Sequence, residues 1–525
     1  MSGTGGAAAR QKAAAPRRGR DRRAQVIPAP PGRQRFETSA APSAAIVGGG
    51  IAGLAAATAL AERGVRVTLY EREQGLGGRL AGWPVELPDG STATMSRGFH
   101  AFFRQYYNLR GLLRRADPSL GSLTGLPDYP LRHSNGMHDS FARVPRTPPW
   151  SALGFVALSP AFGWRDLVRM DPVAALPLLD VRVPQVYERF DTVSARDFLS
   201  RIRFPEAAHH LAFEVFSRSF FADPAQLSAA ELVLMFHIYF LGSSEGLLFD
   251  VPDEPYPQAL WEPLGRYLAG HGVDFRTGTA VDEAGPDGDG GVRVTAGGRT
   301  RRHDALVLAL DTAGLRRLVA ASPRLCDRAW RERIAALRTA PPFLVSRLWL
   351  DRPVLADRAG FLGTSGFGPL DNVSVLERWE GEAARWSARS GGSVVELHAY
   401  AYDDGGDRRA AADRLVQRLH EVYPETADAK VVHRHDEWRD DCPLFPVGGF
   451  TARPTVHTPD PAVTMAGDFV RTDLPVALME RAATTGFLAA NRLLTGWGVR
   501  GQTLWTVPPT GRSAPLRALA RLGAH

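Results

Sequence analysis

Lysine is almost missing from this chain of 525 residues, in which Lys12 and Lys430 are the only two examples. A Schiff base requires a lysine amine beside the reacting carbonyl group. Lys12 lies in a tail that cannot form a core, and Lys430 matches no catalytic position. Schiff-base chemistry therefore has almost no candidate residue.

Cysteine is equally scarce, with only Cys326 and Cys442. Two cysteines so far apart cannot form a disulfide framework, a Cys-x-x-Cys redox pair or a structural zinc site. We interpret both as ordinary buried thiols and predict no metal site.

The chain also lacks a run of about eighteen apolar residues, the length that a membrane-spanning helix needs, and it lacks the apolar core of a secretory signal. We therefore expect a cytoplasmic protein, either free or bound to one membrane face. Residues 1–42 form an Arg-, Ala-, Pro- and Gly-rich segment whose excess of basic residues equals the whole net charge of +7. We predict a disordered basic tail, either simply solvated or loosely attracted to anionic lipid, and no nucleic-acid partner.

A glycine motif follows the tail. Gly48, Gly50 and Gly53 fit the pattern Gly-x-Gly-x-x-Gly between a predicted strand at 44–47 and a predicted helix at 51–63. Glu71 ends the next predicted strand, eighteen residues after Gly53, where a carboxylate can bind ribose hydroxyls. The helix N-terminus offers its N–H groups to a pyrophosphate. The unit predicts a Rossmann-type dinucleotide site, for either a nicotinamide or a flavin cofactor.

Two further elements favour FAD over a nicotinamide. Gly77-Gly78-Arg79 comes soon after the acidic residue, and its arginine can contact a phosphate. Gly467-Asp468 ends a late strand and leads into an Ala-rich helix that runs from about residue 475 to 494. The aspartate can take the ribityl hydroxyls, and the helix dipole can stabilise reduced flavin.

Together these motifs resemble those of the FAD-containing amine oxidase and carotenoid desaturase superfamily, from about residue 44 to 494. The resemblance implies an α/β fold, with a discontinuous Rossmann-type FAD-binding domain and an α+β substrate domain rich in apolar helices. We assign residues 43–124, 256–342 and 440–515 to the FAD domain. Residues 125–255 and 343–439 form the substrate or membrane-associated domain. The candidate FAD contacts, with Val281 as the backbone contact to adenine, are Gly48, Gly50, Gly53, Glu71, Arg72, Gly78, Arg79, Val281, Gly467, Asp468 and Met479.

The aromatic segment 96–109 and the segment 245–250 are similar to those of the β-carotene desaturase/methyltransferases, also called isorenieratene synthases. That resemblance implies FAD-dependent desaturation of the β-ionone rings of a C40 carotenoid, with a 1,2-methyl migration that yields aromatic rings. Arg97, His100 and Arg104 are the candidate catalytic residues, because they can supply charge or proton transfer beside an apolar wall.

Two apolar segments, 150–170 and 232–241, fit a tunnel for a long hydrocarbon and favour a monotopic protein on the cytoplasmic face of the membrane. The second segment follows Ser228 and Glu231, which we interpret as a helix capping box.

Competing interpretations are another carotenoid desaturase, an amine oxidase, which commonly needs a lysine near the flavin, and a non-enzymatic flavin-bearing carotenoid binder. A Gly-x-Ser-x-Gly match at 242–246 also exists, but it follows a predicted helix rather than a strand, so we interpret it as a loop. The number of rings modified, the proton acceptor, the electron acceptor and the oligomeric state remain open.

Overall fold

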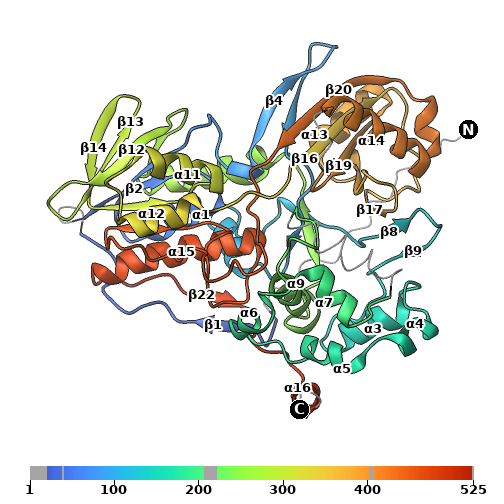
Figure 1. Ribbon diagram of the computed structural model, residues 1–525. Helices are drawn as coiled ribbons and strands as arrows, with labels where there is room; N and C mark the ends of the chain where they lie inside the picture. The colour runs from blue at the N-terminus through green and yellow to red at the C-terminus, as the bar shows by residue number, and fades with distance from the viewer. Residues whose placement is uncertain (1–20, 38–40, 206–220, 403–406, 523–525) are drawn as a thin grey trace, which may run out of the picture.

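The computed structural model describes residues 21–37, 41–205, 221–402 and 407–522. Figure 1 shows a sheet with its covering helices α1 and α15 on one side, a second sheet with α13 and α14 on the other, and a group of helices below the second sheet. The expected α/β class, with a Rossmann-type domain and an α+β domain, is confirmed.

The first sheet is parallel and has the strand order β11-β3-β2-β15-β21. Its strands are β2 (Ser43–Val47), β3 (Arg66–Tyr70), β11 (Asp274–Arg276), β15 (Ala305–Leu308) and β21 (Val463–Met465). Three distant parts of the chain, 43–70, 274–308 and 463–465, thus build one sheet. Such a sheet buries both faces, which explains its short, mostly apolar strands.

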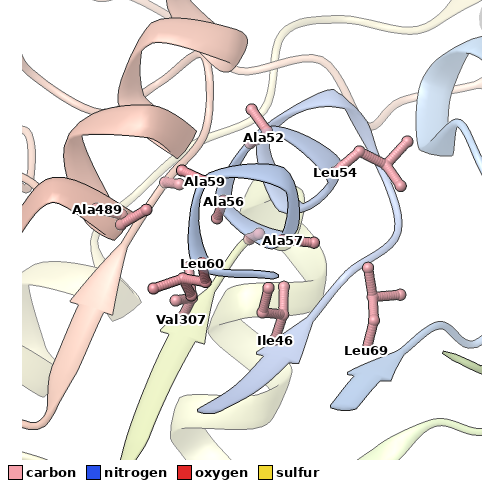
Figure 2. Close-up of a cluster of buried hydrophobic side chains, with 14 of the residues drawn as sticks. Ile46, Ala52, Leu54, Ala56, Ala57, Ala59, Leu60, Leu69, Val307 and Ala489 are labelled. Atoms are coloured by element: carbon pink, nitrogen blue, oxygen red, sulfur yellow. The ribbon is translucent and has the colours of Figure 1, made fainter. Parts of the chain in front are cut away.

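Helix α1 (Ile51–Glu62) covers this sheet, and α15 (Leu478–Gly496) packs on α1. In Figure 2, Ala57 and Leu60 of α1 lie over the sheet residues Ile46 and Val307, while Ala59 lies beside Ala489 of α15. The small side chains of the Ala-rich helix allow this close approach. All residues of α1 from Ile51 to Ala61 are buried, so the helix forms the centre of the main core.

Shorter elements extend this half of the protein. An antiparallel sheet of β12 (Val281–Pro286), β13 (Val292–Ala296) and β14 (Arg299–His303) lies beside α11 (Thr312–Ala321) and α12 (Arg328–Ala335). A hairpin of β4 (Gly82–Glu86) and β5 (Thr92–Ser96) reaches toward the second sheet. The remaining elements here are α2 (Tyr107–Leu113), η7 (Pro257–Trp261), α10 (Glu262–Gly270) and the small sheet of β6 (Phe102–Phe103), β10 (Phe249–Pro252) and β7 (Leu123–Gly125).

The second sheet has the order β20-β16-β19-β18-β17-β8-β9. Its main strands are β16 (Phe343–Leu350), β17 (Phe361–Ser365), β18 (Asn372–Val375), β19 (Ser393–Ala399) and β20 (Val431–Arg439), and its helices are α13 (Gly381–Ser390) and α14 (Arg408–Val422). Strands β8 (Leu131–His133) and β9 (His138–Asp139) join its edge. Because β8, β9 and β10 lie within 125–255, this part of the substrate domain is not entirely helical.

The helical region contains α3 (Trp150–Leu158), α4 (Trp164–Arg169), α5 (Pro172–Ala175), α6 (Gln185–Phe190), α7 (Ala195–Arg201), α9 (Ala229–Phe236) and the π-helical turn η6 (His237–Leu241). Residues 232–241 are buried apart from the half-buried Phe236. This segment is therefore interior core and does not face lipid. Within the described ranges, no helix combines the length and apolar character needed to cross a bilayer.

The predicted disordered tail is partly ordered. Strand β1 (Gln25–Ile27) pairs antiparallel with β22 (Leu504–Thr506), and Phe36 is buried. Asp21 forms an ion pair with Arg512, 2.6 Å between Oδ1 and Nη2. The basic composition of the tail concealed these contacts, because their partners lie at the other end of the chain. Residues 1–20 and 38–40 of the expected tail lie outside the described residues.

Candidate active site

The glycines of the turn at 48–53 have two roles: two of them allow close packing, and one leaves an open face. A Cβ on Gly53 would lie 1.9 Å from the Gly48 carbonyl oxygen, and one on Gly48 would lie 2.3 Å from the Ala309 oxygen. A Cβ on Gly50 would have no described protein atom closer than 3.7 Å. Gly48 and Gly53 therefore let the backbone pack, whereas Gly50 leaves room where a phosphate group would approach helix α1.

The second glycine loop is joined to the first. The Gly77 N–H donates to the Gly49 oxygen at 2.9 Å, and a Cβ on Gly77, whose φ is +109°, would lie 2.4 Å from Nε1 of Trp261. Gly77 forms an isolated parallel bridge with Gly50, and a Cβ on Gly78 would lie 3.0 Å from the Gly50 Cα. The two loops thus form one glycine-lined cradle.

Glu71 organises the other end of this cradle. Its Oε2 accepts from the Gly49 N–H at 2.6 Å, and its Oε1 accepts from the Glu73 N–H at 2.9 Å. Val281 begins β12, two residues after Thr279, whose N–H donates to the Glu71 carbonyl at 2.8 Å. Both residues therefore lie at the carboxyl end of β3, where an adenosine would bind. Arg72, by contrast, is exposed and pairs with Glu73.

Arg79 and Asp468 meet at the centre of the site, 2.5 Å between Nη2 and Oδ2. Burial disfavours the charged guanidinium, but the attraction of Asp468 outweighs it and raises the pKa of Arg79 above its usual value. The pair includes the late Gly467-Asp468 turn, which is held by hydrogen bonds from and to Thr485 of α15 at 3.0 Å. The half-buried Met479 lies in the first turn of α15.

These residues fit FAD. The N-termini of α1 and α15 have no capping side chain among the described residues, so their N–H groups can serve a ligand. The cradle has space at Gly50 for a pyrophosphate, and carboxylates lie at both places where a dinucleotide presents hydroxyls, Glu71 and Asp468. When bound, FAD would supply hydride-accepting chemistry that no side chain can provide.

His100 has the geometry of a general base. Its Nδ1 lies 2.9 Å from the Gly98 carbonyl oxygen, so this nitrogen is the donor and Nε2 carries the free lone pair. The Tyr256 hydroxyl donates to the same oxygen at 2.8 Å. Burial lowers the pKa of His100 to about 4, so the ring is neutral near neutral pH. A neutral imidazole can accept a proton from a substrate.

The two candidate arginines are both neutralised by acids. Arg97 pairs with Asp441, and Arg104 pairs with Asp250 at 2.9 Å. Asp250 also binds Arg110 at 2.6 Å, so its arginines tie β10 to β6 and α2. Neither Arg97 nor Arg104 lines the cavity that His100 borders. Their catalytic roles stay predictions, as do the FAD contacts residue by residue.

A buried polar row behind the 96–103 segment was not predicted. Glu396 accepts from Arg347 (Nη2–Oε2, 2.6 Å), from the Phe99 N–H at 2.9 Å, and lies 2.9 Å from His398 Nε2. Burial alone would raise the pKa of Glu396, but Arg347 lowers it to about 2. His398 in turn bonds Tyr400. Glu396, His398 and Tyr400 alternate along β19 and the residue that follows it, and this pattern in the sequence could have indicated the row.

A second unpredicted cluster joins the helical region to α15. Glu231 accepts from Arg453 at 2.5 Å, from Arg481 at 2.8 Å and from the Tyr187 hydroxyl at 3.0 Å. Ser228 does cap α9, but Glu231 faces these arginines rather than the Ser228 N–H. The predicted capping box was thus only half right, because two buried cations compete for the carboxylate.

The structure also shows where the Gly-x-Ser-x-Gly match, Lys430 and Cys442 lie. Ser244 of the Gly-x-Ser-x-Gly match follows the π-helical turn and bonds Asp21, as expected for a loop. Lys430 is exposed, directly before β20. Cys442 is buried next to Arg79, and burial raises its pKa to about 12, so it is a neutral thiol.

Comparison with known proteins identifies the family. The family described as flavin containing amine oxidoreductase matches residues 51–494. A carotenoid phi-ring synthase of Streptomyces griseus is 74% identical over 506 residues, covering 96% of this chain and 98% of that protein. A carotenoid phi-ring synthase of Chlorobaculum tepidum is 28% identical, covering 89% and 91%. A 15-cis-phytoene desaturase of Synechococcus elongatus is 25% identical, covering 78% and 90%.

Solved structures share the fold. A variant of putrescine oxidase has a TM-score of 0.63 at 17% identity, covering 86% of this chain and 99% of its own. An oxidoreductase from Methanosarcina mazei has a TM-score of 0.62 at 16% identity, covering 85% and 98%. The predicted FAD cofactor and the oxidoreductase class are confirmed. The chain belongs to the flavin-containing amine oxidoreductase family, in the group of its carotenoid phi-ring synthases.

Proposed function

We propose that this enzyme converts the β-ionone rings of β-carotene, a C40 carotenoid, into the aromatic rings of isorenieratene. The observation that carries the proposal is the 74% identity with the Streptomyces griseus carotenoid phi-ring synthase over nearly the whole of both chains. The aromatic segment 96–109, on which the sequence resemblance rests, contains His100, whose ring meets that of Tyr256 at a centroid distance of 6.0 Å.

The chemistry requires little from side chains. When bound, FAD would supply the acceptor for a hydride from an allylic C–H bond of the ring. The resulting carbocation lies beside the quaternary carbon, so one methyl group shifts to it. Loss of a proton to His100 Nε2 then forms the double bond, and repetition yields the aromatic ring. The protein must position the ring, exclude water and remove protons.

The surroundings of the segment suit an apolar ring. Phe99 stacks on Phe361 with a centroid distance of 4.1 Å, and Phe103 meets Tyr239 at 4.6 Å. Such aromatic walls bury hydrocarbon without offering it charge. An amine oxidase reaction is disfavoured, because Lys430 is exposed on the second sheet and Lys12 lies outside the described residues.

Peripheral attachment to the cytoplasmic face of a membrane belongs to the same proposal, since the substrate dissolves in lipid. The large exposed apolar side chains of the helical region gather in α3 to α5: Trp150 (62% exposed), Leu153 (50%), Leu158 (53%), Val168 (77%) and Val173 (58%). These helices lie together at one end of the protein, at the lower right of Figure 1. We call this set the α3–α5 patch. A group of exposed apolar side chains of this kind suits contact with acyl chains.

Product analysis tests the function. The enzyme is expressed in a bacterial host that accumulates β-carotene, and the pigments are separated and identified by NMR and mass. We expect products with aromatic rings and a relocated methyl group, and none from a His100→Ala variant. Unchanged β-carotene in cells that contain flavin-loaded enzyme would refute the proposal.

A further inference from the structure

Two neighbouring cavities share part of their border, and His100 lines the smaller of them. The inner one, about 20 Å³, is bordered by His100, Phe99 and Tyr256 and has room for about one water molecule. The outer one, about 250 Å³, lies between the β4–β5 hairpin and α13. Its border includes the exposed residues Thr92, Arg385 and Arg389, so it is reached from solvent.

Among the residues that the structure describes, only Arg347 and Glu380 border both cavities. Arg347 is fixed by Glu396, Ser96 and the Thr94 carbonyl, and a guanidinium does not release its proton in a protein. Glu380 precedes the first turn of α13 and caps no N–H there. Glu380 is therefore the one group shared by both cavities that can take up and release a proton.

The surroundings of Glu380 bring its pKa close to neutral pH. Burial raises its pKa to about 7, with Arg347 acting in the opposite direction. Other groups near it hold their protons or charges firmly: the pKa of Tyr256 is far above its usual value because of burial, and Arg347 keeps Glu396 ionised. The charged and titratable groups that face Glu380 from the packed elements are Arg347, Glu382, Glu396, Glu254, Arg385 and Tyr256.

We propose that Glu380 is the exit residue for the protons that ring desaturation releases, linking His100 through the inner cavity to the outer pocket. Each desaturation moves a hydride to the flavin, which is reduced as the ring is oxidised. The second C–H bond then breaks, its electron pair forms the double bond and its proton goes to His100 Nε2. The proton passes through water in the inner cavity to the Glu380 carboxylate and on to bulk water. This step rests on the function proposed above.

The test compares Glu380→Gln with Glu382→Gln, using the flavin-loaded enzyme in vesicles that contain β-carotene. Glu382 borders the outer pocket but not the inner cavity, and it accepts from the Thr94 N–H and hydroxyl, so its variant removes a similar charge without removing a group of the relay. Single turnovers are quenched for product analysis. Proton release is followed with an indicator that absorbs in the red, away from carotenoid and flavin. Melting curves check that both variants fold.

In Glu380→Gln we expect first-turnover product at the wild-type rate, proton release slowed at least about tenfold, and recovery in Glu380→Asp. Glu382→Gln should match the wild type in both. Fast proton release in Glu380→Gln, or equal slowing in both variants, would overturn the relay. A second readout does not need turnover: an infrared carboxyl band that titrates near pH 7, distinct from the band expected for Glu480 near pH 8, should disappear only in Glu380→Gln. If wild-type enzyme yields no product but shows this band, the proposed function fails and not the assignment of Glu380.

Discussion

Glu231 of α9 and Arg481 of α15 form an ion pair of 2.8 Å in which both side chains are only 1% exposed. Arg481 also donates to the carbonyl of Asp468, at 3.3 Å, and Arg453 donates to that of Phe469, at 3.0 Å. The cluster thus connects the apolar helical region with the turn that we expect to hold the ribityl chain. A shift of α9 would therefore also move the turn that we expect to contact the flavin.

Replacing Glu231 with Gln should lower the free energy of unfolding by about 3–5 kcal/mol, because two buried guanidinium groups lose their anion. Thermal and urea unfolding measure this loss. The matched control is Glu332→Gln on exposed α12, where the pair with Arg328 should contribute less than about 0.5 kcal/mol. Equal effects of the two variants would contradict a structural role for the cluster.

The pH dependence of the Glu231 effect has a definite sign. The two arginines outweigh burial and depress the pKa of Glu231. A depressed carboxyl pKa contributes stability that is present above the unfolded-state pKa and is lost as pH falls through the folded-state value. The stability difference between wild type and Glu231→Gln should therefore shrink in acid.

The glycine cradle predicts opposite outcomes for two alanine variants. Gly50→Ala should leave the apoprotein as stable as wild type, since its backbone is extended and its Cβ meets no close protein atom, but FAD should be lost. Gly53→Ala should destabilise the apoprotein itself, because its Cβ would lie 1.9 Å from the Gly48 oxygen. Flavin content after desalting and apoprotein melting curves separate the two effects. Full flavin retention in Gly50→Ala would show that the pyrophosphate binds elsewhere.

Glu480 gives a prediction for alkaline pH. Its carboxyl accepts from the backbone N–H groups of Asn108 and Leu109 at 2.8 and 2.9 Å, yet burial raises its pKa to about 8. A carboxyl with a raised folded-state pKa contributes stability that is present below the unfolded value, 4.5, and is lost as pH rises through 8.

Glu480→Gln should therefore be less stable than wild type by about 1–3 kcal/mol near pH 5, since one N–H group of α2 loses its acceptor. The gap should narrow toward pH 9, about one pH unit above the folded-state pKa. Melting temperatures across this range measure it. A gap that widens with pH would mean that the carboxylate is charged in the folded protein.

The α3–α5 patch predicts vesicle binding. Changing Trp150, Leu153 and Leu158 to Ser should reduce flotation with phospholipid vesicles at least tenfold, because each apolar side chain contributes about 1.5–3 kcal/mol on leaving water. The control is Leu355→Ser, which removes an equally exposed leucine (50%) outside the patch. Unchanged flotation of the triple variant would exclude this surface as the membrane contact.

Local patterns predicted the FAD half of the protein well. The glycine turn, β2, α1 and β3 depend on neighbours in sequence, so the predicted strand at 44–47 and helix at 51–63 coincide closely with β2 and α1. Strands β8 and β9, with three and two residues, are too short to show alternation. The partners of Glu231 lie at 453 and 481, and no local rule links them. The ion pairs of Arg97 and Arg104 could not be predicted either, because their acidic partners, Asp441 and Asp250, are also remote in sequence.

The pairing of β1 with β22 joins two segments that are synthesised at very different times. Residues 25–27 are synthesised hundreds of residues before their hydrogen-bonding partners, 504–506. Asp468, which meets Arg79, is also translated late. The nascent chain must therefore keep the first glycine turn and its flanking strands competent until residues 463–506 have been made. We expect stable flavin incorporation only after that point, so flavin supply and chaperone access at that stage should limit the yield of active enzyme.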